Sequence, residues 1–186
     1  MEDIIQQIVA GVNRTVNEAS PIVDARLPDG SRVHVVLYPA ALNGPILTIR
    51  KFPKDSITMK QLIEWNSISK EAADYLNHVI KEKKHILISG STGSGKTTFL
   101  NALSDYIPKD ERIITIEDNA ELRIQNVSNL VRLEARNANM EGEGALTIRD
   151  LLKASLRMRP NWLIVGEVRS VEAVDMLQAL NTFVPG

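Results

Sequence analysis

Eight residues near the middle of the chain have the types and spacing that hold a chain of phosphates. They read G-S-T-G-S-G-K-T and are Gly90, Ser91, Thr92, Gly93, Ser94, Gly95, Lys96 and Thr97. Glycines in this pattern tolerate positive φ, so that backbone amides can approach phosphate oxygens closely. Lys96 would reach the β- and γ-phosphates, and the Thr97 hydroxyl would bind Mg²⁺. The chemistry indicated is the binding of a nucleoside triphosphate with magnesium.

The residues on either side of this loop support the same interpretation. His85–Ser89 is an apolar run, which we expect to form a buried strand leading into the loop. Thr97–Leu103 contains neither Pro nor Gly and predicts a helix, whose first turn, including Thr98, would face the phosphates. A stretch rich in Gly and Ser can also be a solvated turn, but a strand before it and a helix after it favour a nucleotide site.

Carboxylates should lie at the ends of neighbouring strands, where they hold magnesium and orient the attacking water. Trp162–Val168 predicts an apolar strand that carries Glu167, which would bind Mg²⁺, directly or through a water, or activate the attacking water. Arg112–Ile116 predicts a second strand, followed by Glu117 and Asp118 as further catalytic candidates. An acid just beyond a buried strand is often only solvated, so the argument depends on finding two such strands in one chain.

Arginines could complete a γ-phosphate site, in cis or from a neighbouring subunit. The candidates are Arg26, Arg32, Arg50, Arg132, Arg136, Arg149, Arg157, Arg159 and Arg169. We interpret most of them as solvated or as members of structural ion pairs. The histidines His34, His78 and His85 have neither metal-ligand spacing nor acidic neighbours that suggest catalysis, and we interpret them as structural.

Composition restricts the class of protein further. The 186 residues include 22 Lys and Arg against 23 Asp and Glu, so no global field favours nucleic acid or a membrane surface. Aromatic residues make up only 4% of the chain, which disfavours a RecA-like nucleic-acid motor with stacking aromatics. There is no Cys, and no apolar stretch approaches the roughly 20 residues of a membrane span. We expect a soluble, intracellular protein without direct membrane insertion.

A small N-terminal domain is predicted over residues 1–53. Apolar residues at helical spacing predict an amphipathic helix from Glu2 to Glu18. Ile22–Leu27 and Arg32–Leu37 flank a turn centred on Asp-Gly and predict a β-hairpin, and Ile46–Arg50 predicts a third strand.

The rest of the chain predicts a linker with helices over residues 54–84 and an α/β domain over residues 85–186. The remaining elements expected are helices near Met59–Ile63 and after Ser69, a strand at Leu130–Glu134, a helix at Thr147–Met158 capped by Thr147, and a last helix capped by Ser170. Alternating strands and helices predict a mostly parallel sheet with helices on both faces and nucleotide at the carboxyl ends of the strands.

Five separated blocks resemble one family. They are Asp24–Arg32, Leu47–Phe52, the phosphate loop, Thr115–Leu122, and Leu156–Pro160 leading into Val165–Arg169. In this order, over nearly the whole chain, they resemble the secretion ATPases of type II and type IV systems. Within that superfamily the chain looks closest to the branch that assembles tight-adherence (Flp) pili.

The resemblance implies a hexameric ATPase with a small, PAS-like α+β N-terminal domain before a RecA-like P-loop domain. It implies that ATP and Mg²⁺ bind between the two domains at a subunit interface, where Arg32 and Arg50 contact the phosphates. Glu167 corresponds to the Walker-B glutamate, and Glu117 and Asp118 to the aspartate box. Hydrolysis would power pilus assembly or protein secretion through inner-membrane platform proteins, and the protein would be cytoplasmic and peripheral at the inner face of the membrane.

The chain departs from this family in two places. Asn161-Trp162 stands where family members usually carry Asp-Arg, a change that we expect to affect packing more than chemistry. After Thr182 the family continues through a histidine box, whereas Phe183–Gly186 closes this sequence. We therefore expect a P-loop domain truncated at its C-terminus. The main hypothesis is ATP turnover, and two alternatives stay open: nucleotide binding without turnover, and the less favoured RecA-like nucleic-acid motor.

Overall fold

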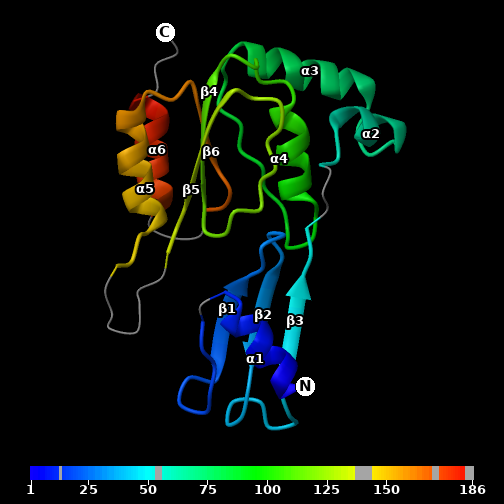
Figure 1. Cartoon of the computed structure of the whole chain (residues 1–186). Helices are drawn as coiled ribbons and strands as arrows, with labels where there is room; N and C mark the ends of the chain where they lie inside the picture. The colour runs from blue at the N-terminus through cyan, green and yellow to red at the C-terminus, as the bar shows by residue number, and fades with distance from the viewer. Residues whose placement is uncertain (13, 53–55, 137–143, 169–171, 183–186) are drawn as a thin grey trace. The chain divides into compact units, whose positions relative to one another are not determined.

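The chain divides into two compact units, Met1–Lys54 and Asp55–Gly186, which we describe separately (Figure 1). The structure is a computed structural model and describes residues 1–12, 14–52, 56–136, 144–168 and 172–182. The expected domain end at Pro53, the arginine Arg169, the helix cap Ser170 and the tail Phe183–Gly186 lie outside these ranges.

The first unit contains an antiparallel sheet of three strands in the order β1-β2-β3 (Figure 1). The strands are β1 (Ile22–Arg26), β2 (Arg32–Val36) and β3 (Ile46–Arg50), which confirms the predicted hairpin and third strand. The turn between β1 and β2 is closed by Asp29, whose carboxylate accepts the N–H and the O–H of Ser31, both at 2.9 Å. These hydrogen bonds lower the pKa of Asp29, the backbone N–H most strongly.

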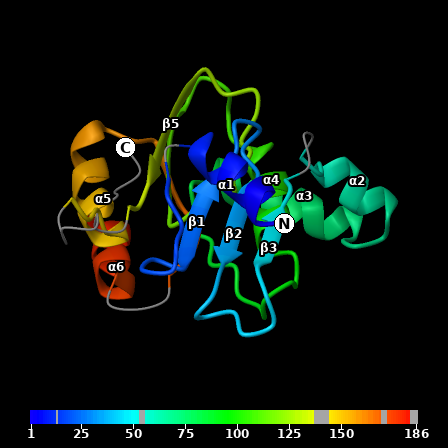
Figure 2. The ribbon, with the colours of Figure 1, turned by 60° about the horizontal axis from the view of Figure 1, so that its bottom comes forward.

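Helix α1 (Glu2–Ala10) lies across one face of this sheet (Figure 2). Its buried side chains Ile5 and Val9 pack in one apolar cluster with Val33 and Val35 of β2. Because neighbouring strand residues point to opposite sides, the face away from α1 carries polar residues, together with one apolar rung of Ile22, Val36 and Ile46.

The prediction of a helix as far as Glu18 is wrong. Helix α1 ends at Ala10, with Gly11 as its C-cap residue. Glycine favours this end because it costs more backbone entropy inside a helix than other residues do. The chain then returns along the helix, where the Gln6 side chain donates a 3.0 Å hydrogen bond to the carbonyl of Val16.

The second unit contains a parallel sheet in the order β5-β4-β6. Its strands are β4 (Arg112–Glu117), β5 (Asn129–Glu134) and β6 (Trp162–Val165). Central β4 is buried on both faces: Ile113 belongs to the apolar cluster on one side, and Ile114 and Ile116 to the cluster on the other. The predicted parallel sheet is confirmed.

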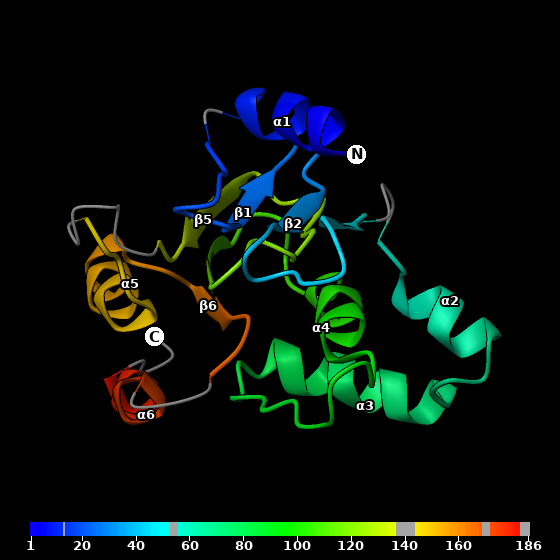
Figure 3. The same cartoon turned by 90° about the horizontal axis from the view of Figure 1, so that it is seen from below.

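Helices cover both faces of this sheet, as predicted (Figures 1 and 3). One face carries α2 (Met59–Glu64), α3 (Lys70–Lys81) and α4 (Lys96–Ser104); the other carries α5 (Ile148–Ser155), the 3₁₀ turn Leu156–Met158 and α6 (Glu172–Thr182). Residues 56–84, expected to be a linker with helices, pack through α2 and α3 into the core of the second unit.

Side-chain caps fix the starts of two of these helices at the predicted residues. The Ser69 hydroxyl accepts the N–H of Ala72 at the start of α3. Thr147 and Asp150 form a reciprocal capping box at the start of α5, and the Thr147 hydroxyl is the main cause of a lowered pKa at Asp150. The local sequence therefore determines where these helices begin.

Two strand predictions need correction. His85–Ser89 is not a strand and is not buried: Leu87 is 82% exposed. A strand needs a backbone partner, and among the described residues none pairs with this segment; a groove of about 650 Å³ is instead lined by it and by β6. The strand predicted over Trp162–Val168 ends at Val165. The N–H of Gly166 still donates to the carbonyl of Ile116 at 2.8 Å, and among the described residues no later backbone group of this segment bonds to β4.

Candidate functional site

The glycine-rich loop turns sharply into the first turn of α4. Gly93 (φ 79°) and Gly95 (φ 89°) adopt left-handed backbone conformations that glycine alone tolerates at little cost. Gly95 is the N-cap of α4, and its carbonyl accepts the N–H of Phe99 at 2.8 Å. The first amides of α4 have no partner inside the helix and carry its positive dipole end, which suits an anion.

Lys96 folds back over the loop that precedes it. Its Nζ donates to the carbonyl oxygens of Gly90 at 2.9 Å and Ser91 at 2.8 Å. A phosphate oxygen is a stronger acceptor for an ammonium group than these neutral carbonyls are. The ammonium group therefore lies at the loop, where a phosphate could replace or join its present partners.

Glu167 lines the same groove as the loop. The walls of this groove include Gly90, Lys96 and Thr97 from the loop and Gly166 and Glu167 from the segment after β6. The structure thus brings a lysine, a threonine hydroxyl and a carboxylate, all predicted as site residues, to one concave surface. This set contains a phosphate-binding cation and two of the oxygen ligands that Mg²⁺ prefers.

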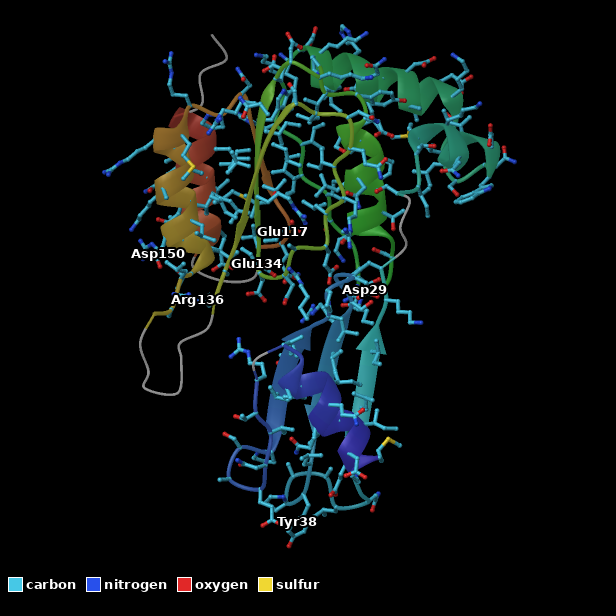
Figure 4. All side chains as sticks on the ribbon, in the orientation of Figure 1. Asp29, Tyr38, Glu117, Glu134, Arg136 and Asp150 are labelled. Carbon is cyan, nitrogen blue, oxygen red and sulfur yellow. The ribbon has the colours of Figure 1, made fainter. Side chains whose placement is uncertain are left out.

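Glu117 and Asp118 differ in their surroundings although they are neighbours in the chain. Glu117, labelled in Figure 4, is only 3% exposed, and its Oε2 accepts the N–H groups of Glu121 and Leu122, both at 2.7 Å. Its Oε1 is buried without a hydrogen-bond partner among the described residues, and burial raises the pKa of this carboxyl group. Asp118 is exposed, and its Oδ2 lies 3.3 Å from Nδ2 of Asn119.

Because Glu117 is buried, we predict that the wild type and the Glu117→Gln variant differ in stability by an amount that depends on pH. Because burial raises its pKa above the ordinary 4.5, the folded state holds a proton that the unfolded state has lost in the pH window just above 4.5. In that window the free energy of unfolding of the wild type should fall with rising pH relative to the variant, which does not titrate here. Urea titrations at a series of pH values measure the difference, and a constant difference across the window would contradict the burial.

Gly166 leaves room for Glu117. A Cβ at residue 166 would lie 2.9 Å from Cγ of Glu117, which is closer than packed carbons approach, and in ordinary contact at 3.5 Å from its Cβ. Gly166→Ala should therefore lower the free energy of unfolding by about 1–3 kcal/mol. Urea denaturation of a double-mutant cycle with Glu117→Ala tests the cause, because the alanine removes the clashing Cγ. An equal cost of Gly166→Ala in both backgrounds would show that the contact is not responsible.

The predicted phosphate ligands Arg32 and Arg50 are direct neighbours in the sheet of the first unit. They stand opposite each other in the β2–β3 register, and Arg26 stands opposite Arg32 in the β1–β2 register. Arg32 and Arg50 line a cavity of about 250 Å³, and the Arg50 guanidinium lies 5.5 Å from the ring centre of Phe52. Three arginines therefore share one rung of this sheet.

Two histidines lie close to carboxylates on the surface. Nδ1 of His34 lies 2.9 Å from Oδ1 of Asp24, its partner residue across the hairpin, and Nε2 of His78 lies 3.1 Å from Oε1 of Glu82, one helical turn away. The strand register and the i,i+4 spacing are the signals that could have revealed these pairs. Both pairs are exposed, as is usual for surface ion pairs.

Three of the candidate arginines make structural contacts in the second unit. Arg132 donates from Nη2 to the carbonyl of Leu122 at 3.1 Å, and Arg136 from Nε to the carbonyl of Gly144 at 2.9 Å. Arg149 lies 2.9 Å from the carboxylate of Asp175. Within the described part of the chain there is no cluster of three or more His, Asp or Glu side chains arranged to hold a metal, and none of the helices there is long and apolar enough to span a bilayer.

A glycine loop at a helix N-terminus, in a parallel α/β unit that follows a small antiparallel sheet, is an architecture shared with known proteins. The chain belongs to the type II/IV secretion system protein family, whose sequence profile matches residues 1–183. The resemblance to secretion ATPases of type II and type IV systems is therefore confirmed.

Individual relatives agree with this assignment. A protein of Methanocaldococcus jannaschii is 43% identical over 98% of this chain and 26% of its own length. The type IV secretion system protein PtlH of Bordetella pertussis is 35% identical over 90% of this chain and 56% of its own length. The crystal structure of the VirB11 ATPase from the Brucella suis type IV secretion system, in complex with sulphate, superposes with a TM-score of 0.52 at 29% identity, covering 97% of this chain and 61% of that one. The chain thus spans less than two thirds of the length of these relatives.

Proposed function

We propose that this chain is the nucleotide-binding part of a motor that binds and hydrolyses ATP with Mg²⁺ to power pilus assembly or protein secretion across the inner membrane. The observation that supports it most is the groove in which Gly90, Lys96 and Thr97 meet Glu167. The VirB11 ATPase crystallised in complex with sulphate, which is in keeping with a fold that accepts anions. Membership of the secretion family supplies the class of process.

In this proposal the glycine loop and the first turn of α4 bind the triphosphate. The loop amides, together with Thr98, donate to phosphate oxygens, and Lys96 neutralises the outer phosphates. Thr97 would bind Mg²⁺ directly and Glu167 would contact it through a water, and the metal when bound would neutralise charge on the phosphates. Asp118, exposed after β4, would hold a water ligand of Mg²⁺, and Glu167 would orient the attacking water. The buried Glu117 holds the loop that carries Asp118 by accepting two of its amides.

For the whole protein we propose a homo-hexamer in which Arg32 and Arg50 complete the phosphate site. These two arginines share one rung of the sheet, and in this proposal both of their charges would act on the phosphates. Inner-membrane platform proteins of a secretion or pilus system would be the partners, and the protein would work in the cytoplasm at the inner face of the membrane. These proposals rest on the family and on the VirB11 likeness.

A second candidate function is nucleotide binding without turnover. It is favoured by His85–Ser89, the segment before the loop, because a catalytic loop is normally held on a paired strand and this segment has no strand partner among the residues described. Strong binding with no hydrolysis would then be a property of this chain itself.

Calorimetric titration with a slowly hydrolysed ATP analogue and Mg²⁺, set beside a phosphate-release assay with ATP, separates these candidates. Binding in the micromolar range with steady turnover would support the motor. Binding without turnover would support the second candidate. If the chain binds no nucleotide at all, both proposals are wrong.

A further inference from the structure

The loop after β4 is held almost entirely by side chains. We call residues 118–123 the acidic loop; it begins with Asp118 and has no regular secondary structure. Four consecutive amides of this loop donate to side-chain oxygens of three other elements: Ala120 to Glu134 of β5 at 3.0 Å, Glu121 and Leu122 to Glu117 of β4 at 2.7 Å, and Arg123 to Asn101 of α4 at 2.8 Å. Such a loop keeps its shape only while these acceptors are in place.

Both backbone groups of Arg123 are fixed. Its N–H donates to Oδ1 of Asn101, and its carbonyl accepts a 3.0 Å hydrogen bond from the hydroxyl of Ser56, near the beginning of the second unit. The neighbouring Leu122 is only 1% exposed and packs in the same apolar cluster as Ala102 of α4. The end of the acidic loop is therefore attached to α4 by one directed hydrogen bond and by apolar packing beside it.

Helix α4 connects this attachment to the phosphate-binding loop. It begins at Lys96, so Asn101 lies five residues after the lysine on one continuous helix. A helix transmits position with little deformation over this distance, whereas an irregular loop does not. Through α4, Asn101 therefore links the position of the acidic loop to the position of Lys96.

We propose that Asn101 is a positioning residue of the nucleotide site: by accepting the Arg123 amide, it sets the position of Asp118 relative to Lys96. The inference rests on the proposed function, because it assigns Asp118 a role near the magnesium end of the triphosphate. Ser56 secures the same residue through its carbonyl. Sequence patterns did not indicate either residue, since an Asn on a helix and a Ser in a loop are common surface residues.

The test compares Asn101→Leu, which removes the acceptor at similar volume, with Asn101→Asp, which keeps an acceptor oxygen. Calorimetry measures two quantities for each protein. The affinity for ADP without Mg²⁺ reports on the glycine loop. The gain in affinity for an ATP analogue on adding Mg²⁺ also depends on the acidic loop. Asn101→Leu should reduce the Mg²⁺-dependent gain about tenfold, while the affinity for ADP stays within about twofold. Asn101→Asp should restore most of the gain.

Amide hydrogen exchange of Arg123 gives an independent readout and should accelerate about tenfold in Asn101→Leu. Equal losses of ADP affinity and of the Mg²⁺-dependent gain would mean general damage to the site and would overturn the inference. If the wild type binds normally and Asn101→Leu keeps the full Mg²⁺-dependent gain in affinity, the inference about Asn101 is wrong, while the proposed function stands. A wild type that binds neither ligand would overturn the proposed function and this inference with it.

Discussion

Replacing Lys96 with alanine should weaken the binding of MgATP at least about a hundredfold. Nζ of Lys96 lies at the loop, within 2.9 Å of two of its carbonyls. With nucleotide bound, its hydrogen bonds to the outer phosphates would be charge-assisted, and two such bonds account for a loss of this size. Calorimetric titration of both proteins with a slowly hydrolysed analogue measures the change.

Lys60→Ala is the matched control for this experiment. Lys60 is exposed on α2, where it pairs with Glu64 at 3.8 Å, and it does not line the groove. Its loss should leave MgATP affinity within about twofold, because a surface ion pair contributes little. Equal affinities of wild type and Lys96→Ala, with both proteins folded by circular dichroism, would remove the glycine loop as the binding site.

Glu167→Gln should lower ATP turnover by about two to three orders of magnitude while affinity for MgATP stays within about threefold. The amide keeps the size of the side chain but loses the negative charge that would orient a water or hold Mg²⁺. Glu167 lines the groove beside Lys96 and Thr97, so the change acts where the phosphates would lie. Steady-state phosphate release and calorimetry measure the two quantities separately.

Glu64→Gln, on the exposed end of α2, is the control and should turn over ATP at the wild-type rate. A Glu167→Gln protein with unchanged turnover would rule out a catalytic role for this carboxylate. A parallel loss of turnover and of affinity would instead assign Glu167 to binding, and the proposed division of roles would then be wrong.

The features that the sequence predicted well are local. The Asp-Gly turn determined the β1–β2 hairpin, because Asp29 closes it through hydrogen bonds to Ser31 two residues away. Ser69 and Thr147 act as helix caps at the expected positions, since capping depends on residues three apart. The central strand β4 was predicted to within one residue because its apolar run is buried on both faces.

The features that the sequence did not predict depend on contacts distant in the chain. His85–Ser89 has the composition of a buried strand, but pairing is decided by a neighbouring backbone, which composition does not specify. The sequence predicted Glu117 as a catalytic candidate just beyond the end of a strand. Its burial comes from a loop that folds back over it and from the missing side chain of Gly166, and neither can be read from the residues next to it.

The central claim is that backbone amides around the glycine loop bind the triphosphate. The most direct test is to follow the amide chemical shifts of the ¹⁵N-labelled chain during titration with MgATP, using adenosine as the ligand that lacks phosphates. We predict that the largest shifts with MgATP, absent with adenosine, occur between Gly93 and Thr98. Saturable shifts that leave these amides unmoved and gather elsewhere in the chain would contradict the claim.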